Sequence, residues 1–415
     1  MDFGRELEAV RRPMKILWVK SDFLHPTTRG GQIRTLEMLR RLHRRHEVHY
    51  VAFDDARQPE GLARAHEYAT HVYPVSHSAP DKRSPAFAAQ LVQGLFSPLP
   101  LAVSRWVSEK MHRKIEEVVR QHLFESIVCD FLVPAPSLGD VLSRAVLFQH
   151  NVETLIWRRF ADEARGPLGR FYMRLQARRM FQCERTFARR ARHVVAVSET
   201  DAKRMREMFS LDDVSSVPTG VDLEYFDRPG RENARQFDVV FVGSMDWMPN
   251  QDGVRFFLSD VLPRLRNIVP QATVGIVGRQ PPPELRILAE RAGGVTVTGT
   301  VPDVRPYLWG SALSIVPLRI GGGTRLKIYE SMAAGTPVVS TSIGAEGLDV
   351  QDGNTIRLAD APQAFADACA DLLQDNAART RISQAGRQLV AARFSWDAVT
   401  DVFEKILERH PASSG

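Results

Sequence analysis

The sequence predicts an α/β protein of two domains, each built on an open, doubly wound parallel sheet. Short apolar runs alternate with helical patterns in two successive series along the chain. A polar stretch at 227–236, rich in arginine and glycine, separates the two series. The length of 415 residues also fits two domains at roughly 100–200 residues each.

The first series opens with the apolar run Met14–Val19, which is typical of a buried parallel strand. Gly30 and Gly31 follow at a strand-to-helix turn, and a second strand is expected at Val48–Phe53. This βαβ opening is Rossmann-like, although a glycine pair alone is weak support for a ligand site because tight turns commonly need one. Further strands are expected at 126–129, 145–148 and 193–197, and we assign residues 1–222 to this domain.

The second series begins after a turn at Val217–Asp222. Its expected strands are 237–243, 272–278, 295–297, 313–316 and 337–340. Helical patterns separate them at 253–269, 283–292, 326–334 and 361–373. We assign residues 223–392 to a second Rossmann-like domain and residues 393–415, with a helix near Trp396–Leu407, to a terminal segment.

The composition is that of a soluble globular protein, with 44% hydrophobic and 25% charged residues. A net charge of +6 suits an anionic partner, and no nucleic-acid reader motif is present, so a nucleic-acid partner is not expected. The three cysteines are far apart, which predicts neither a disulfide framework nor a zinc site. No apolar stretch approaches the roughly 20 residues that span a bilayer, and we expect a cytoplasmic location.

The most informative segment is a glycine loop that leads into a helix. Gly321, Gly322 and Gly323 follow the apolar run 313–318, and in open α/β sheets ligands bind at the carboxyl ends of strands. Glycines let the backbone approach a ligand closely, and Thr324 is a good N-cap for the next helix. The free amides and positive dipole end of that helix predict a phosphate site.

Three charged side chains follow the loop. Arg325 and Lys327 lie in the first helical turn, where the dipole disfavours cations, so we expect a bound anion to be the reason for their presence. Glu330, further along the helix, is placed to accept hydrogen bonds from ribose hydroxyls. A solvated loop with surface charges is the alternative, but the order of loop, cap, cations and acid favours the phosphate site.

These residues resemble a known family. The run Gly323–Val339 is similar to the donor-site signature of the retaining GT-B glycosyltransferases of family GT4, also called glycosyl transferases group 1. The resemblance implies two Rossmann-like domains that face each other across a cleft, with the C-terminal helix crossing back toward the first domain. Segments in the family's order extend the likeness over nearly all of the chain: 150–153, 197–198, 218–222, 241–244, Gly278, 299–304 and 394–396.

The resemblance also implies roles for individual residues. The second domain is expected to bind a nucleotide-sugar donor of UDP or GDP type, and Gly30 and Gly31 to face its diphosphate. His150, at the end of a strand, is expected near the transferred sugar, with a capping or core histidine as the alternative. Further expected donor-binding residues are Gly243, Ser244, Gly278 and Val301, and weaker acceptor-side candidates are Asp130, Asn151 and Glu153.

The chain departs from the family pattern at two places. The family often carries two glutamates with seven residues between them; Glu330 matches the second, but Gly322 occupies the position of the first. The family also often has an arginine and a lysine after the first strand of the second domain, and residues 243–250 contain neither. We interpret Arg325 and Lys327 as a relocated phosphate clamp.

Glycosyl transfer of this kind builds negative charge on the departing nucleoside diphosphate. Backbone amides together with Arg325 and Lys327 are expected to stabilise that charge. The sequence contains no Asp-x-Asp metal motif, so we expect neither a metal nor another cofactor. The family implies retention of anomeric configuration by same-face attack. No residue stands out as a covalent nucleophile, so the paired-carboxylate scheme of glycoside hydrolases does not carry over.

Two first-domain stretches bear on the acceptor, Leu91–Trp106 and Trp157–Arg192. Their mixture of apolar and basic residues predicts peripheral docking on anionic lipid at the inner membrane face, with a glycan or lipid-linked acceptor from cell-surface polysaccharide or glycolipid synthesis. A core-facing helix with a solvated basic side explains the pattern equally well. Two other functions remain open: a nucleotide-sugar epimerase, whose acid/base set we do not locate, and a non-catalytic scaffold, which Gly322 favours.

Overall fold

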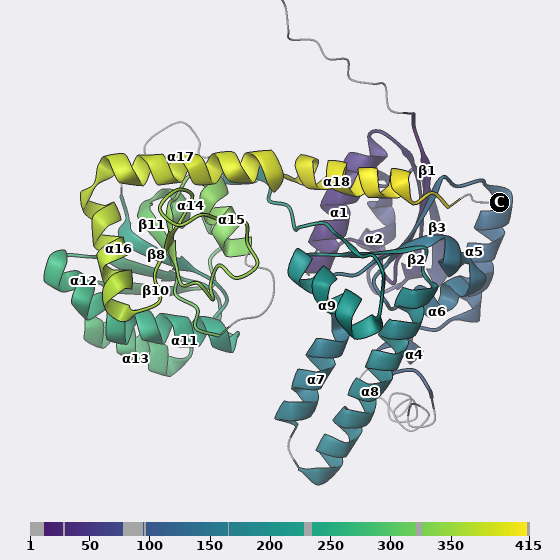
Figure 1. Cartoon of the computed structure of the whole chain (residues 1–415), viewed down its shortest axis with the longest axis horizontal. Coiled ribbons are helices and arrows are strands. Elements are labelled where there is room, and N and C mark those ends of the chain that lie inside the picture. The colour runs from purple at the N-terminus through teal and green to yellow at the C-terminus, as the bar shows by residue number, and fades with distance from the viewer. Residues whose placement is uncertain are drawn as a thin grey trace, which may run out of the picture. The chain divides into compact units, whose positions relative to one another are not determined.

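A computed structural model describes residues 12–27, 30–77, 94, 97–164, 166–227, 235–320 and 326–412. The predicted glycine loop and its first cation, Gly321 to Arg325, lie outside these described residues, as do residues 91–93, 95 and 96 of the apolar stretch that begins at Leu91. The chain divides into two compact units (Figure 1). One consists of Met1–Pro218 with Val399–Gly415, and the other is Thr219–Ala398. The predicted α/β class with two parallel sheets is confirmed.

The first unit contains a seven-stranded sheet in the order β3-β2-β1-β4-β5-β6-β7, and every neighbouring pair is parallel. The central strands are apolar on both faces and fully buried because helices cover both sides. The strands are β1 Lys15–Val19, β2 Glu47–Asp54, β3 His71–Ser76, β4 Ser126–Asp130, β5 Ala145–Phe148, β6 His193–Ala196 and β7 Ser215–Ser216.

The helices of this unit follow their strands as βαβ connections require. Serine N-caps mark two of the starts, since Ser108 accepts a hydrogen bond from the amide of Met111 and Ser198 from that of Asp201. The α-helices are α1 Gly30–His43, α2 Pro59–Ala63, α4 Leu101–Ser104, α5 Glu109–Gln121, α6 Ala135–Leu138, α7 Glu153–Glu163, α8 Pro167–Arg190 and α9 Glu199–Phe209.

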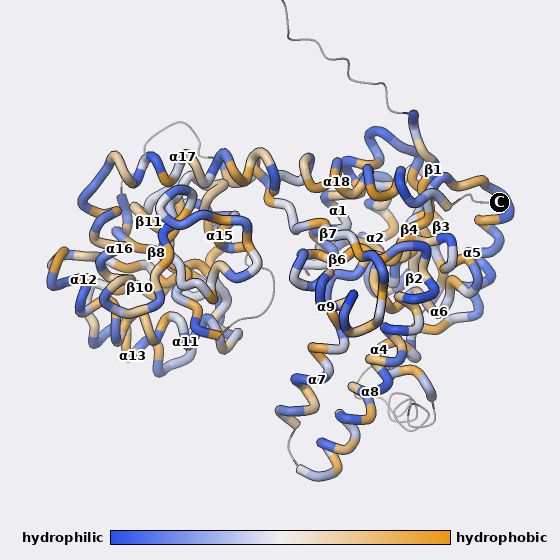
Figure 2. Tube along the Cα trace, in the orientation of Figure 1, coloured by the Kyte–Doolittle hydropathy of each residue, from blue (hydrophilic) through white to orange (hydrophobic). Residues whose placement is uncertain are grey.

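The arginine-rich stretch Trp157–Arg192, predicted as one long helical region, is instead a helical hairpin. Helix α7 ends because Ala164 leaves the helical conformation with a ψ of 134°, and Pro167 starts α8 after Gly166, which has a φ of 73°. Along both helices hydrophilic and hydrophobic residues alternate (Figure 2), and the hairpin extends away from the sheet of its unit (Figure 1).

The second unit contains a six-stranded parallel sheet in the order β10-β9-β8-β11-β12-β13. The strands are β8 Phe237–Val242, β9 Val274–Val277, β10 Val295–Gly299, β11 Ser311–Val316, β12 Val338–Ser340 and β13 Arg357–Leu358. The helices are α10 Leu223–Phe226, α11 Met248–Phe256, a π-helix Phe257–Val261, α12 Leu262–Ile268, α13 Pro283–Ala292, α14 Arg305–Trp309, α15 Leu326–Ala333, α16 Pro362–Gln374 and α17 Asn376–Arg393.

The last helix, α18 Trp396–Arg409, begins in the second unit and from Val399 onward belongs to the first. Its Phe403 ring lies 5.7 Å from the ring of Trp18 and 4.9 Å from that of Phe148. At the other junction the units divide after Pro218, whereas the sequence placed the division after residue 222. The isolated bridge between Val221 and Ser395 accounts for the difference, because it ties the intervening turn to the second unit.

Candidate functional site

Lys327, in the first turn of α15, contacts the loop after β8. Its Nζ donates to Asn250 Oδ1 at 2.6 Å and lies 4.7 Å from the centre of the Phe241 ring. Asn250, on α11, in turn donates its Nδ2 to the backbone oxygen of Ser244 at 2.7 Å. The ammonium group is therefore held at the carboxyl end of β8, where open α/β sheets bind ligands.

Gly243 and Gly278 bring the loops after β8 and β9 into close contact. A Cβ on Gly278 would lie 1.8 Å from the backbone oxygen of Gly243, and a Cβ on Gly243 would lie 3.0 Å from Lys327 Nζ. Any side chain at either position would collide with its neighbours, since Cβ atoms do not approach other heavy atoms so closely. The structure thus brings together three of the predicted donor-site residues.

The loop after β9 supplies a cation that the sequence interpretation missed. Arg279 Nε donates to Ser244 Oγ at 2.7 Å, and the Arg279 guanidinium lies 3.1 Å from Asp246 Oδ2. The hydrogen bond from Ser244 and the charge of Arg279 lower the pKa of Asp246. Arg279, in the loop after the neighbouring strand, therefore partly replaces the cations that are missing after β8. In the sequence, Gly278 at the strand end directly precedes it and marks its position.

Glu330 and Val301 are the remaining predicted site residues of this unit that the structure describes. Burial raises the pKa of Glu330, and the charge of Lys327 partly opposes this. Among the described side chains none donates a hydrogen bond to the Glu330 carboxylate, which leaves both oxygens able to accept from a ligand. Val301, after β10, packs on the apolar cluster that contains Ile328 and Tyr329.

In the first unit, Asp130 at the end of β4 is the centre of a buried polar cluster. Its Oδ2 accepts hydrogen bonds from Trp18 Nε1 at 2.9 Å, Lys20 Nζ at 3.0 Å and Thr35 Oγ1 at 2.7 Å. Burial alone would raise the pKa of Asp130, but Lys20 and His150 outweigh it and hold that pKa well below its usual range. Asp130 is therefore an ionised carboxylate at neutral pH.

His150 follows β5 and lies against this carboxylate, with its Nε2 2.8 Å from Asp130 Oδ1. Burial lowers the pKa of His150 to about 4, which Asp130 only partly opposes, so the imidazole is neutral at pH 7. An ionised carboxylate only accepts hydrogen bonds, so its charge favours the tautomer with the proton on Nε2, although the two atoms meet outside hydrogen-bond geometry. Nδ1 is then left as an acceptor.

The other side of the imidazole packs on Phe131 and Gly31. The rings of Phe131 and His150 stack with centroids 4.0 Å apart, and Phe131 has a φ of 73°, a strained conformation for a bulky residue. A Cβ on Gly31 would lie 2.8 Å from the Phe131 ring and 3.5 Å from His150 Nδ1. The same construction at Gly30 meets nothing within 4 Å. Of the predicted glycine pair, only Gly31 is required by close packing.

Two buried cations beside Asp130 were not predicted. Lys20, just after β1, is 2% exposed and lies 4.5 Å from the centre of the Phe131 ring. Arg34, on α1, is also buried, and within the described part of the chain its Nη1 has no hydrogen-bond partner. Burial lowers the pKa of Arg34 to about 9, and Asp130 and Asp201 partly oppose this. Two buried cations, Lys20 and Arg34, therefore lie close to Asp130 at this end of the sheet.

Glu184, on α8, fixes the loop that carries His150. Its carboxylate accepts from the amides of Glu153 at 3.0 Å and Thr154 at 2.8 Å, and from Thr154 Oγ1 at 2.6 Å. It thus caps the first turn of α7, although burial raises its pKa to about 7. Two of the three predicted acceptor-side residues lie at this turn: Asn151 is exposed and donates to Glu153 Oε1 at 3.4 Å.

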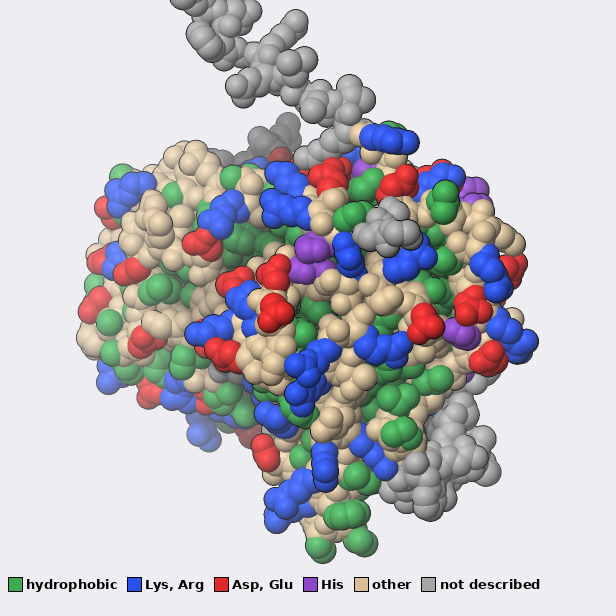
Figure 3. Space-filling view, turned by 45° about the vertical axis from the view of Figure 1, so that its right-hand side comes forward, with side chains coloured by type: hydrophobic (Ala, Val, Ile, Leu, Met, Phe, Trp, Pro, Cys, Tyr) green, Lys and Arg blue, Asp and Glu red, His purple; other side chains and the backbone are tan. Residues whose placement is uncertain are grey.

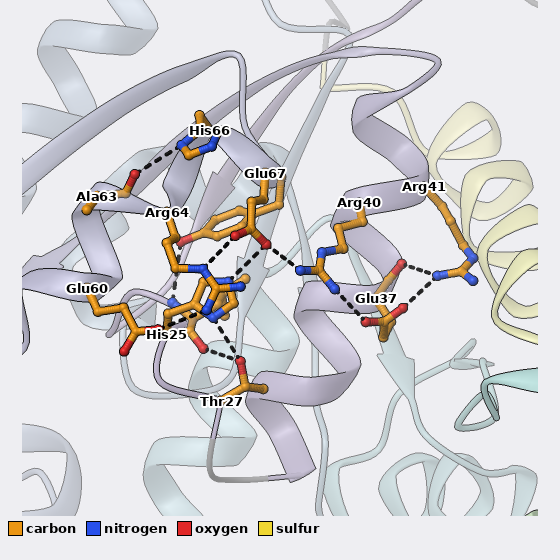
Figure 4. A network of polar contacts seen from close by, with 12 residues as sticks. His25, Thr27, Glu37, Arg40, Arg41, Glu60, Ala63, Arg64, His66 and Glu67 are labelled. Carbon is orange, nitrogen blue, oxygen red and sulfur yellow. Dashed lines mark hydrogen bonds and ion pairs between the residues drawn. The ribbon is translucent and has the colours of Figure 1, made fainter. Parts of the chain in front are cut away.

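A cavity of about 430 Å³ lies between the loop after β1, helix α1 and helix α2, which follows β2. Arg64 and Arg40 line it and also bind Glu67, and these contacts lower the pKa of Glu67 to about 2 (Figure 4). Thr27 Oγ1 lies 3.2 Å from Nδ1 of His25, which also lines the cavity. A cavity of this size rich in donors and acceptors suits a sugar-sized polar ligand.

Two groups of described side chains offer metal-ligand atoms within 4.8 Å of one another, Glu47 with His49 and His71, and His193 with Asp213 and His410. His49, His71 and His193 lie at the amino ends of β2, β3 and β6, the opposite edge of the sheet from Asp130 and His150. Neither group adjoins the clusters described above. That the chemistry needs no metal stays a prediction.

Fold and site together define a two-domain α/β protein of the kind that binds nucleotides at the carboxyl ends of its strands. The family described as Glycosyl transferases group 1 matches residues 236–375, and that described as Glycosyltransferase Family 4 matches residues 137–225. Together these matches span more than half of the chain. The chain belongs to this family of GT-B glycosyltransferases.

Three curated relatives illustrate the family. The chain is 34% identical to the lipopolysaccharide core biosynthesis glycosyltransferase LpsE of Rhizobium meliloti over 29% of this chain and 36% of the relative. It is 28% identical to a D-inositol 3-phosphate glycosyltransferase of Xylanimonas cellulosilytica over 53% and 58%. It is 30% identical to the phosphatidyl-myo-inositol mannosyltransferase of Mycobacterium leprae over 50% and 54%. The chain therefore spans about half the length of the relatives it matches.

Solved structures match over nearly the whole chain. Sucrose-phosphate synthase from Thermosynechococcus elongatus has a TM-score of 0.66 at 16% identity and covers 95% of this chain and 98% of its own. Anabaena Alr3699/HepE, in complex with UDP and glucose, has a TM-score of 0.62 at 16% identity over 95% and 100%. At this identity the likeness shows the GT-B fold. Among the described helices, none is both long and apolar enough to cross a membrane.

Proposed function

We propose that this protein transfers a sugar from a nucleoside-diphosphate donor of UDP or GDP type to a glycan or lipid-linked acceptor. The reaction retains the anomeric configuration, needs no metal, and serves cell-surface polysaccharide or glycolipid synthesis at the inner face of the membrane. The names of relatives that act in lipopolysaccharide core synthesis and on phosphatidyl-myo-inositol support this acceptor class.

The observation that carries the proposal is the placement of Lys327 between Gly243 and Asn250 at the carboxyl end of β8. There an ammonium group stands beside two glycine loops and the Arg279 guanidinium, which is the arrangement that a diphosphate requires. Glu330 lies on the same helix with acceptor oxygens for the ribose.

In the proposed reaction the bond between the anomeric carbon and the diphosphate oxygen breaks, and the nucleoside diphosphate leaves with the bonding electron pair. Lys327, Arg279 and backbone amides stabilise the charge that develops on it. The acceptor hydroxyl oxygen bonds to the anomeric carbon on the same face, and its proton passes to the departing diphosphate. His150 is neutral, so its role is to accept a hydrogen bond from a sugar hydroxyl through Nδ1.

On the acceptor side we assign the cavity between α1 and α2 to a sugar unit of the acceptor. Its paired charges, Arg64 and Arg40 with Glu67, give fixed donors and acceptors for hydroxyl groups. Arg34 adds a buried positive charge in the same unit that suits an anionic group on the acceptor.

The test is a titration with UDP, GDP and ADP, in the presence and absence of EDTA, while the unfolding temperature is followed. One nucleotide should raise that temperature with or without the chelator, because a ligand at about 100 times its Kd adds roughly 2.7 kcal/mol to the native state. Screening nucleotide sugars for donor hydrolysis then identifies the sugar. If no nucleotide shifts the transition, the donor site is wrong and a non-catalytic scaffold becomes the better description.

A further inference from the structure

We propose that the distal part of the α7–α8 hairpin, residues 157–178, docks on an anionic lipid bilayer. The inference rests on the proposed function, since it supplies the surface on which a lipid-linked acceptor is met. It goes beyond that function by assigning the contact to one element of the first unit. Two independent observations carry it, the exposed apolar side chains near the turn of the hairpin and the arginines beside them that form no ion pair with a described carboxylate.

The apolar side chains near the turn are too exposed to serve the core. Leu168 is 84% exposed, Phe171 is 68% exposed and Phe160 is 49% exposed. Leu168 and Phe171 are three residues apart and therefore share one face of α8, while Phe160 belongs to the last part of α7. Large apolar side chains that cluster at the tip of a projecting hairpin indicate a contact surface, because they are not needed to form the hydrophobic core.

The charges beside this tip are strongly one-sided. Arg170, Arg174 and Arg178 recur every four residues along α8, which forms a basic stripe next to the apolar one. All three are exposed, as are Arg158 and Arg159 on α7. In the part of the hairpin that the structure describes, none of these five forms an ion pair with a carboxylate. Figure 3 shows the basic and apolar side chains together on the projecting hairpin.

This combination favours an anionic bilayer over other occupants. Apolar groups at a tip can enter the headgroup region while flanking arginines remain at its surface and attract acidic lipids. A protein partner or a second copy would have to offer acidic groups and an apolar pocket together. The first unit also carries exposed acidic side chains, so the experiment must distinguish docking on a bilayer from association with a second copy of this chain.

The base of the hairpin links this surface to the site. Glu184 on α8 holds the first turn of α7, and Gln149 Nε2, one residue before His150, lies 3.4 Å from the same carboxylate. The two helices therefore form one rigid connection from the lipid-facing tip to the loop that carries His150. A docked hairpin would place this end of the first sheet at a fixed height above the bilayer.

The experiment is co-sedimentation of the full chain with vesicles of phosphatidylcholine alone, or of phosphatidylcholine with phosphatidylglycerol at 7:3. The charge variant combines Arg170→Gln, Arg174→Gln and Arg178→Gln, since glutamine keeps the helix propensity. The apolar variant combines Leu168→Ser and Phe171→Ser. The matched controls are Arg44→Gln and Leu123→Ser, an exposed arginine and an 89% exposed leucine elsewhere in the same unit.

We expect the wild type and both controls to sediment with the mixed vesicles, less so as salt is raised, and not with phosphatidylcholine alone. Each hairpin variant should lose at least about tenfold in partitioning, as the contribution of a few arginines at an acidic surface predicts. Unchanged partitioning of the hairpin variants would overturn the proposal. So would light scattering that shows a wild-type oligomer which the hairpin variants disrupt while vesicle binding persists.

The failure of docking and the failure of the proposed function are separable. The nucleotide titration of the same variants without lipid reads the donor site alone, and both hairpin variants should keep the wild-type shift. A wild type that sediments through its hairpin but gains no stability from any nucleotide supports docking and refutes the transferase. A wild type that a nucleotide stabilises but that does not sediment through its hairpin refutes docking and keeps the transferase proposal.

Discussion

The Oδ1 atom of Asp130, at the end of β4, lies 2.8 Å from Nε2 of His150, which follows the adjacent strand β5. The register of β4 and β5 pairs Asp130 with Phe148, so the histidine two residues later comes over the end of the neighbouring strand. The same carboxylate accepts a hydrogen bond from Lys20. One acid thus orients the histidine and also serves as counter-charge for a buried cation.

Replacing this acid by its amide should be costly to the fold. Asp130→Asn keeps the shape but removes the counter-charge of the buried Lys20 and leaves Arg34 with Asp201 alone, so we expect the free energy of unfolding to fall by about 3 kcal/mol. Urea denaturation measures the change. Asp140→Asn, on the exposed surface of the same unit, is the control and should shift little. An equally small change for Asp130→Asn would show that the cations are hydrated or paired otherwise.

The pH dependence of stability should report the buried imidazole. Burial lowers the pKa of native His150 to about 4, whereas the unfolded histidine titrates near its ordinary value of 6.5. Between these values the unfolded chain binds the extra proton, so stability falls as pH is lowered from about 6.5 to about 4. His150→Gln should flatten the slope of unfolding free energy against pH in this window. The exposed His66→Gln should keep the wild-type slope.

Lys327→Ala tests the phosphate clamp. We expect transfer to fall by about 10²–10³, as for removal of one group that stabilises developing charge, and the nucleotide-induced rise in unfolding temperature to disappear. The protein should remain folded because the side chain is only partly buried. Lys405→Ala, an exposed lysine on α18, is the matched control. A wild-type transfer rate in Lys327→Ala would show that this charge is not used.

The glycine pair after β1 offers a comparison within two adjacent residues. Gly31→Ala places a Cβ 2.8 Å from the Phe131 ring, so Phe131 and the stacked His150 must move, and we expect a large loss of transfer. Gly30→Ala meets no atom within 4 Å and should be neutral or slightly stabilising. Kinetics of both variants check this. Equal activities would remove the argument that Gly31 packs under the imidazole for function.

The positions of the central strands along the chain were predictable because each is a short apolar run. The predicted strand 145–148 coincides with β5, and the helix 283–292 coincides with α13. The edge strand β3 was missed because only Val75 of it is buried, which leaves no apolar run to recognise. Helix α17 was missed for a similar reason, since its buried residues are Ile382, Gly386 and Val390 in an otherwise polar sequence.

The residues of the candidate site likewise divide into those that the sequence could predict and those that it could not. Lys327 and Gly278 could be selected from local patterns, a helix start and a strand end. Lys20 could not, because its partner Asp130 is 110 residues away and the two meet only through the parallel register of β1 and β4. Arg34 looked like one more polar position on an amphipathic helix, and only the packing of α1 shows that it is buried.

Because α18 returns to the first unit from Val399 onward, the second unit is in topological terms an insertion within the first. A fragment that ends at Pro218 lacks Phe403, whose ring covers Trp18 and Phe148, so part of its core would face water. A peptide of residues 396–412 supplied in trans should bind that fragment and stabilise it. The first unit should therefore reassemble from two separate pieces, the fragment that ends at Pro218 and the C-terminal peptide.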